Sequence, residues 1–457
     1  MRMRLKFWLV AWLTLGVMVC VQAAELPRQG LVMALGGSVR FDNQAVWTRF
    51  IQEAGGKGAR IAIFATAAGN PDRSAQRLKR TLEHYGAVSE IIPVAPRLKG
   101  VDWKSLRDDP RLAERVATMD AVFFTGGAQA LIVDTLQPDG QPSLMLQAIR
   151  KVHQRGGVVA GTSAGAAVMS AWMFRDAPNT LAVLKGQLRE GQEIDRGLGF
   201  VGQELFIDQH FLRRGRIGRL LPMMHAKGYR WGLGIEEDSA ALIWGSQIEV
   251  VGARGALLVD LSKAERDERL GPFNLRGARL SFLDRGDRHD LATGVTTPSA
   301  PKLAEQRIDP NAPDFKPYFD QEPFYPDILG DNVIVRAMVH LVDGRERELR
   351  GLAFNGSELR GLPAPKPLRA ARADAPKPEE LGFEFRLYVL PETLGYYTGA
   401  MGGEDYTVMR VGLDVMPVRM QVPLYQPWPA QKALSRKGAA PVPERMKGAQ
   451  AARRNAG

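Results

Sequence analysis

The segment Gly161–Gly165, with the sequence Gly-Thr-Ser-Ala-Gly, constrains the fold of this chain more than any other feature. It follows a short apolar run at 157–160 and opens a run of small residues with a helical pattern, Ala164 to Met173. Between a strand and a helix, a G-x-S-x-G sequence forms a nucleophile elbow, a strained turn that exposes the serine hydroxyl. Glycines beside a serine can also mark an ordinary turn. The segment predicts an α/β fold in which Ser163 is a candidate nucleophile.

A serine nucleophile needs a general base, and the chain has six histidines. His210 ends a short apolar stretch, 204–210, that has the pattern of a strand. In parallel α/β sheets, functional residues gather at the carboxyl ends of the strands. His340 alternates with apolar residues in a predicted late strand, and the others lie in charged or helical stretches. His210 is therefore the candidate base, although a structural histidine is the usual alternative.

The base needs an acid to orient it. An apolar strand start at 232–235 is followed by Glu236, Glu237 and Asp238, while Asp208 shares a face with His210 in an extended segment. Neighbouring residues of a strand point in opposite directions, so only one of the two glutamates can face His210. The residues alone leave this choice open.

Apolar strands alternate with amphipathic helices over the first 300 residues, which predicts a mostly parallel sheet with helices on both faces. The expected strands lie at 31–35, 61–64, 88–94, 121–124, 240–244, 248–251, 256–259 and 279–283. The expected helices lie at 44–54, 74–85 and 144–154. We assign residues 26–297 to a catalytic α/β domain.

The rest of the chain has a different composition. Residues 298–330 are rich in Pro and Asp and are expected to form a linker, and 331–427 a small β-rich domain. Within that domain, 333–342 and 346–354 flank an Asp-Gly pair and predict a hairpin, and 383–390 and 406–415 predict strands. The domain could bind polymer, form a homodimer contact or act as a lid. Residues 428–457 form a basic tail that is expected to be disordered.

The N-terminus has the pattern of a secretory signal peptide at residues 1–23, with a basic start, an uncharged apolar run and small residues before Ala23. The run is short for a stable membrane anchor. The expected location is secreted or periplasmic. Cys20 is the only cysteine, so the mature chain would have no thiolate metal site, and no metal or cofactor is expected. Much of the net charge of +11 lies in the tail, which argues against nucleic-acid binding.

Several stretches together resemble the cyanophycinases, serine hydrolases of a family that also contains bacterial aspartyl dipeptidases. The matching stretches are Leu35–Gly37, Ile61–Ala67, Phe124–Gln129, Gly161–Ala167 and Gly234–Ala240. The most specific is Asp208–Leu220, because its Asp-Gln-His-Phe start and arginine spacing differ from those of the dipeptidases. The resemblance covers about residues 31–297.

The resemblance implies hydrolysis of cyanophycin, a poly-aspartate with an arginine on each side-chain carboxyl, to β-aspartyl-arginine dipeptides. It implies Ser163 as nucleophile, His210 as base and Glu237 as orienting acid. Acyl transfer also needs N–H donors for the developing oxyanion, and we expect these from Ala164 and Gly127.

The resemblance also implies a set of substrate contacts. Each arginine of the polymer has a free α-carboxylate, and arginine side chains bind carboxylates in a bidentate manner. Arg213 does not match the family spacing and is expected at the surface, and Asp208 is expected to receive a substrate guanidinium. The expected binding residues are Gln129, Asp208, Gln209, Arg214, Arg216 and Arg219. The alternatives are an aspartyl dipeptidase-like peptidase and a non-catalytic peptide-binding protein.

Overall fold

The computed structural model describes residues 30–176, 178–320, 323–355, 380–421 and 424. The predicted signal peptide and basic tail lie outside the described residues. In the described part of the chain, no helix has the length and apolar character needed to cross a membrane.

The larger of two main sheets has nine strands, in the order β15-β14-β11-β10-β1-β5-β4-β2-β3. Its parallel half consists of β1 (Leu31–Leu35), β5 (Val158–Thr162), β4 (Ala121–Phe124), β2 (Arg60–Phe64) and β3 (Val88–Ile92). Its antiparallel half consists of β10 (Ser239–Trp244), β11 (Gln247–Gly252), β14 (Arg288–Asp290) and β15 (Val295–Thr297). The predicted α/β class is confirmed.

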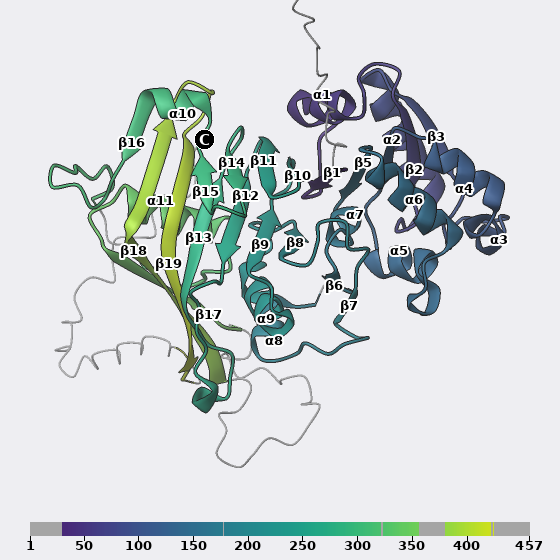
Figure 1. Cartoon of the computed structure of the whole chain (residues 1–457). Helices are drawn as coiled ribbons and strands as arrows, with labels where there is room; N and C mark the ends of the chain where they lie inside the picture. Colours follow the sequence, from purple (N-terminus) through teal and green to yellow (C-terminus); the bar gives the residue numbers. More distant parts are fainter. Residues whose placement is uncertain (1–29, 177, 321–322, 356–379, 422–423, 425–457) are drawn as a thin grey trace, which may run out of the picture.

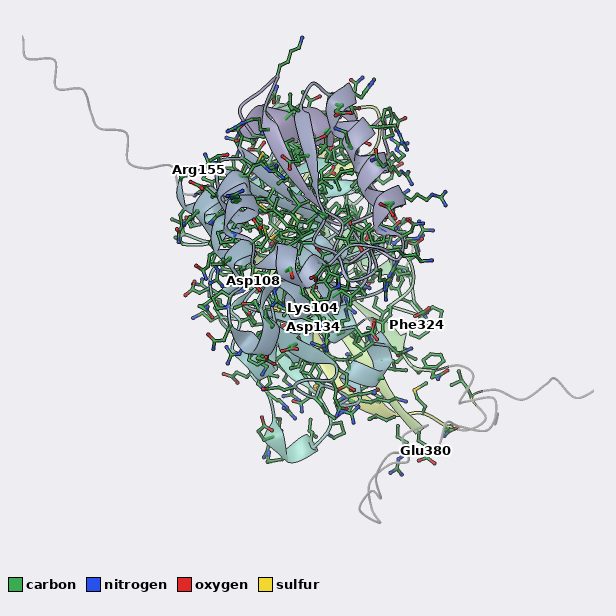
Figure 2. The ribbon with its side chains drawn as sticks, turned by 90° about the vertical axis from the view of Figure 1, so that its right-hand side faces the viewer. Lys104, Asp108, Asp134, Arg155, Phe324 and Glu380 are labelled. Atoms are coloured by element: carbon green, nitrogen blue, oxygen red, sulfur yellow. The ribbon has the colours of Figure 1, made fainter. Side chains whose placement is uncertain are left out.

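Helices cover both faces of the parallel half (Figure 1). They are α1 (Gln44–Glu53), α2 (Pro71–His84), α3 (Trp103–Arg107), α4 (Pro110–Ala117), α5 (Gln129–Leu136) and α6 (Leu144–Gln154). Phe50 and Leu82, from α1 and α2, pack with Phe123 on one face of the sheet, and Ile149 of α6 packs with Phe124 on the other. The outer side of this layer carries charged residues such as Lys104, Asp108 and Asp134 (Figure 2). Burial of alternate strand residues on both faces accounts for the continuous apolar strands.

A second sheet was not predicted from the sequence. Its eight strands are β16 (Gln306–Ile308), β17 (Glu348–Ala353), β18 (Leu381–Thr398), β19 (Asp405–Arg419), β13 (Leu275–Leu283), β12 (Ala256–Asp260), β9 (Trp231–Ile235) and β8 (Leu205–Gln209). The long strands β18 and β19 lie at the left of Figure 1. Because β19 pairs with β13, the sheet runs without interruption across the domain boundaries predicted at 297 and 331.

The two sheets pack against each other through one apolar cluster. Leu233 and Leu258 of the second sheet meet Ile243 and Ile248 of the first in this cluster. The opposite face of the second sheet is covered by α8 (Thr180–Leu184), α9 (Ile217–Lys227) and α11 (Val333–Val342). This packing brings the carboxyl ends of β5, β8 and β9 to one region of the molecule.

Three local predictions were wrong. Residues 333–342 form helix α11 and not a strand, so His340 is helical and the predicted hairpin does not form. β-branched residues favoured a strand, but Ile334, Ala337 and Leu341 share one buried face at helical spacing. The helix after Ser163 ends early, because α7 (Ala164–Ala167) is followed by β6 (Trp172–Phe174), which pairs with β7 (Ile194–Arg196).

The predicted linker contains a helix, α10 (Ala300–Glu305), that is fastened by a buried ion pair. Lys302 is fully buried, and its Nζ lies 3.0 Å from Asp287 Oδ1 and 3.5 Å from Asp284 Oδ2. Thr407 of β19 donates to Asp287 Oδ2 at 2.5 Å. One buried carboxylate therefore connects the predicted linker to strand β19.

We expect Lys302→Met to lower the free energy of unfolding by about 3–5 kcal/mol, because it leaves two carboxylates buried without their cation. Urea denaturation followed by far-UV circular dichroism measures this change. Lys151→Met, at an exposed lysine of α6, is the control and should cost less than about 0.5 kcal/mol. Equal midpoints for the two variants would contradict a stabilising role for the ion pair.

Candidate active site

The elbow around Ser163 is held by two close backbone contacts. Ser163 follows the last residue of β5 and has φ 56° and ψ −110°, which is a strained conformation for a serine. A Cβ on Gly161 would lie 2.4 Å from the carbonyl of Gly165, and one on Gly165 would lie 2.5 Å from Phe124 O. Both glycines are therefore required by packing, and this packing keeps Ser163 in its strained conformation at the end of the strand.

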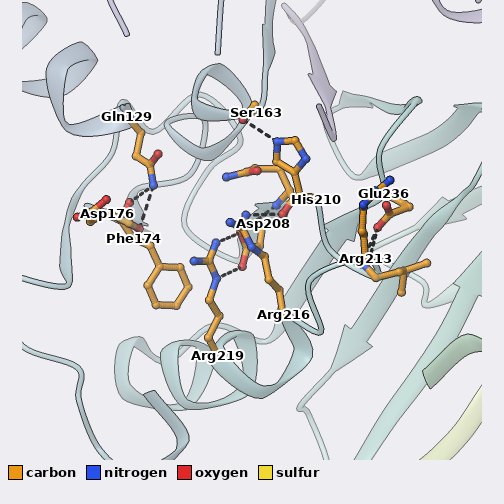
Figure 3. A network of polar contacts seen from close by, with 12 residues as sticks. Gln129, Ser163, Phe174, Asp176, Asp208, His210, Arg213, Arg216, Arg219 and Glu236 are labelled. Atoms are coloured by element: carbon orange, nitrogen blue, oxygen red, sulfur yellow. Dashed lines mark hydrogen bonds and ion pairs between the residues drawn. The ribbon is translucent and has the colours of Figure 1, made fainter. Parts of the chain in front are cut away.

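The structure brings Ser163, His210 and Glu237 together. Ser163 Oγ lies 2.9 Å from His210 Nε2, and His210 Nδ1 lies 2.6 Å from Glu237 Oε1. Figure 3 shows the His210 ring directed at Ser163. His210 and Glu237 are buried and follow β8 and β9 of the second sheet, whereas Ser163 follows β5 of the first. The arrangement is that of a nucleophile, a base and an orienting acid.

Glu236 occupies the opposite side of the strand end. Its Oε2 accepts hydrogen bonds from the backbone N–H groups of Leu212 at 2.5 Å and Arg213 at 3.0 Å. This contact fixes the segment that follows His210 (Figure 3). Geometry therefore decides between the two glutamates: Glu237 contacts His210, and Glu236 supports the neighbouring loop.

Two adjacent glycines make room for the candidate base. Gly37 has φ +108°, and a Cβ there would lie 2.3 Å from His210 Cε1. A Cβ on Gly36 would lie 2.0 Å from Glu236 O. The backbone also fixes both segments, because His210 N donates to Gly36 O at 2.8 Å and the N–H of Asp238, the residue after Glu237, donates to Gly37 O at 2.9 Å. The Gly36–Gly37 pair thus positions the base and the acid at once.

The structure gives Asp208 a role other than the predicted one. Asp208 is 1% exposed, and its two oxygens accept from Arg219 Nε at 2.7 Å and Nη2 at 2.5 Å. Burial opposes ionisation, but the charges of Arg219 and Arg216 outweigh it and lower the pKa of this carboxyl. Asp208 and Arg219 therefore satisfy each other, and a substrate guanidinium would have to displace Arg219.

Arg216 is likewise buried and committed to the protein. It is 3% exposed, and its Nη1 donates to Gln209 O at 2.5 Å and lies 3.4 Å from Asp208 Oδ1. These contacts hold the backbone immediately before His210. The side-chain oxygen of Gln209 is buried and has no hydrogen-bond partner among the described residues, and its substrate contact stays a prediction.

Arg213 lies at the surface, as the sequence predicts, with its side chain 53% exposed. Its Nη1 also lies 3.2 Å from Glu237 Oε2, a contact that the sequence did not predict. The two oxygens of Glu237 are thus shared between His210 and Arg213. No sequence signal marks this contact except the position of Arg213 three residues after the base.

Arg214 is exposed and has no carboxylate partner among the described residues. Its charge acts on both His210 and Glu237. Burial, together with Arg214 and Arg216, lowers the pKa of His210 below its ordinary value, although Glu237 acts in the opposite direction. The imidazole therefore stays neutral, as a general base requires.

The expected oxyanion donors lie at the same strand ends. Ala164 begins α7, and the first N–H groups of a helix have no partner within it. Gly127 has φ +144°, and a Cβ there would lie 2.0 Å from Ala67 O. Gly126 is also close, because its Cβ would lie 3.2 Å from Ser163 Cβ. The role of Gly127 stays a prediction.

Gln129 lies at the start of α5 and is buried. Its Nε2 donates to Phe174 O at 2.8 Å and Asp176 O at 3.2 Å (Figure 3). Its amide nitrogen therefore holds the segment after β6, which leaves the amide oxygen for any substrate contact. Among the described residues, no group of three or more His, Cys, Asp or Glu could hold a metal ion.

The geometry defines a serine hydrolase with a nucleophile elbow, and comparisons with known proteins identify the family. Residues 31–251 match the model of peptidase family S51. The chain is 30% identical over 276 residues to the cyanophycinase of Geminocystis herdmanii, covering 57% of this chain and 94% of that protein. It is 27% identical to the cyanophycinase of Synechococcus elongatus, covering 58% and 80%.

A peptidase from an acI-B1 Actinobacterium is 21% identical, with a TM-score of 0.40, over 50% of this chain and 90% of that one. The family match and the Geminocystis relative decide the assignment: this chain belongs to peptidase family S51 and is a serine-type peptidase.

We expect Arg214→Gln to shift the acid limb of the pH profile of kcat/KM to higher pH, by about half a unit at low salt. Hydrolysis needs neutral His210, so activity is lost as the pH falls through the His210 pKa. Removing a nearby positive charge raises that pKa. Arg111→Gln, an exposed arginine of α4, is the control and should leave the limb unchanged. A downward shift, or none, would contradict the assignment of His210 as base beside Arg214.

Proposed function

We propose that this serine-type peptidase hydrolyses cyanophycin to β-aspartyl-arginine dipeptides through an acyl-enzyme. The observation that carries the proposal is the Ser163–His210–Glu237 array with the unpaired cation of Arg214 beside it. The names of the two relatives support the choice of substrate.

The contacts support a conventional acyl-transfer sequence. Ser163 Oγ attacks the scissile carbonyl while His210 Nε2 takes its proton, and Glu237 holds the Nδ1–H of the imidazolium. The N–H groups of Ala164 and Gly127 receive the oxyanion. His210 then gives the proton to the leaving amine, which departs and leaves an ester on Ser163. Water, deprotonated by His210, cleaves the ester and restores the serine.

Substrate recognition falls mainly to Arg214. The polymer presents a free α-carboxylate on each arginine, and Arg214 is the arginine of the Asp208–Leu220 segment that has no carboxylate partner among the described residues and whose charge acts on His210. Arg216 and Arg219 act indirectly, because they fix Asp208 and the backbone of Gln209 ahead of the base. Burial makes both arginines positioning residues.

The test is incubation of the mature protein with purified cyanophycin, followed by mass spectrometry of the soluble products. We expect β-aspartyl-arginine from the wild type and at least a 10³-fold lower rate from Ser163→Ala. Retained activity in Ser163→Ala would overturn the nucleophile. Cleavage of short aspartyl peptides instead of polymer would favour a dipeptidase, and cleavage of neither would favour a binding protein.

We also propose that the protein is exported. The support is the basic start, apolar run and small-residue site within residues 1–23, which lie outside the described residues. Expression of the full chain in a bacterium, with fractionation and intact-mass measurement, tests this. We expect loss of about the first 23 residues and recovery outside the cytoplasm. A cytoplasmic chain that keeps Met1 would contradict export.

A further inference from the structure

A charged pocket of about 400 Å³ lies far from the elbow, where the two sheets meet at their edge. Its walls come from Trp231 and Leu258 of the second sheet and from His289 and Thr296 of the first. Trp231 begins β9, whereas Glu237 lies just beyond the end of that strand. At about 3.3 Å per residue, roughly 15 Å or more separates the pocket from the candidate triad.

The pocket is lined by four cationic and two acidic side chains. The cationic side chains are Arg230, Lys263, Arg279 and Arg410, and the acidic ones are Asp260 and Glu392. Arg230 lies 3.7 Å from Asp260, and Arg279 lies 2.9 Å from Glu392. Lys263 and Arg410 have no carboxylate partner within 4.0 Å in the described part of the chain. Two positive charges are therefore left over on the pocket wall.

Strand irregularities direct two of these side chains into the pocket. Arg410 has φ +58°, which is uncommon for a residue within a strand, and it lies where the β13–β19 register shifts. On the neighbouring strand, the β18–β19 register shifts between Val389 and Leu394, and Glu392 lies in that irregularity. β-bulges re-aim side chains, and persistent backbone strain is a feature of functional sites.

Two aromatic residues of the pocket lining, Trp231 and His289, are buried. Trp231 Nε1 and His289 Nε2 are buried and make no hydrogen bond among the described residues. His289 Nδ1 lies 2.8 Å from Thr296 Oγ1, and burial lowers the pKa of His289 to about 4, so the ring is neutral near pH 7. The Arg230 guanidinium lies 4.8 Å from the centre of the Trp231 ring and covers it.

We propose that this pocket is a second substrate-binding site that holds an aspartyl-arginine unit of the polymer while another unit lies at Ser163. Lys263 and Arg410 bind the free carboxylate, and the guanidinium lies beside Glu392 and Asp260, which keep their ion pairs with Arg279 and Arg230. The proposal rests on the proposed function. Most of the charged residues lie beyond residue 251, outside the part of the chain that matches the family. A polymer that reaches both sites gains affinity by multivalency, whereas a dipeptide-sized substrate cannot.

The experiment compares polymer and short substrate in full-length Lys263→Gln, Arg410→Asn and the double variant. Asparagine tolerates a positive φ, so Arg410→Asn removes the charge and keeps the backbone. We expect the double variant to raise KM for polymer about tenfold, with kcat unchanged and two-unit substrate hydrolysed normally. Lys99→Gln, at an exposed lysine before α3, is the matched control and should behave as wild type.

The second site would be overturned if the double variant had a KM for polymer within twofold of the wild-type value. It would also be overturned if kcat/KM fell equally for polymer and for the two-unit substrate. If the wild type fails to cleave polymer, the proposed function fails instead. Binding then decides the pocket by itself, with a ten-unit aspartyl-arginine oligomer titrated into Ser163→Ala protein. At least fivefold weaker binding after adding both substitutions supports the site, and unchanged binding overturns it.

Discussion

The close approach of Gly36–Gly37 to the segments after β8 and β9 is the contact on which the site depends. Backbone bonds from His210 and Asp238 end on these two glycines, and neither position has room for a side chain. The first sheet thereby holds the base and acid that the second sheet supplies. Because Ser163 follows β5, next to β1 in the first sheet, the same crossing sets the distance between Ser163 and His210.

The charged residues near this crossing fall into two kinds: those that pair with other residues of the protein and support the site, and those that are exposed without a carboxylate partner among the described residues. Asp208 and Arg219 are almost fully buried and satisfy each other, and Arg216 holds the carbonyl of Gln209. A buried pair of this kind fixes backbone position at little net gain in stability. Arg213, Arg216 and Arg219 each pair with a carboxylate, whereas Arg214 is exposed and has no carboxylate partner among the described residues.

The C-terminal hairpin of β18 and β19 extends the second sheet and does not form a unit of its own. Thr407 reaches the buried Asp287–Lys302 pair, and Arg410 reaches the charged pocket at the far end of β9. The same strand therefore contributes to stability through one residue and to the proposed second site through another. The hairpin gives this chain a surface that the family-matched residues 31–251 do not include.

The sequence by itself determined the parallel strands, the elbow at Ser163 and His210 as the candidate base, because strand periodicity and turn chemistry are local properties. It misjudged α11, where β-branched residues suggested a strand although tertiary packing buries one helical face. Only the tertiary structure decided that Glu237 meets His210, that Arg213 joins Glu237 and that Asp208 is taken by Arg219. Some of these contacts, like the β13–β19 pairing, join residues that are far apart in the chain. The others depend on the direction in which neighbouring side chains point. Sequence patterns are local, so these contacts are fixed only when the two sheets pack.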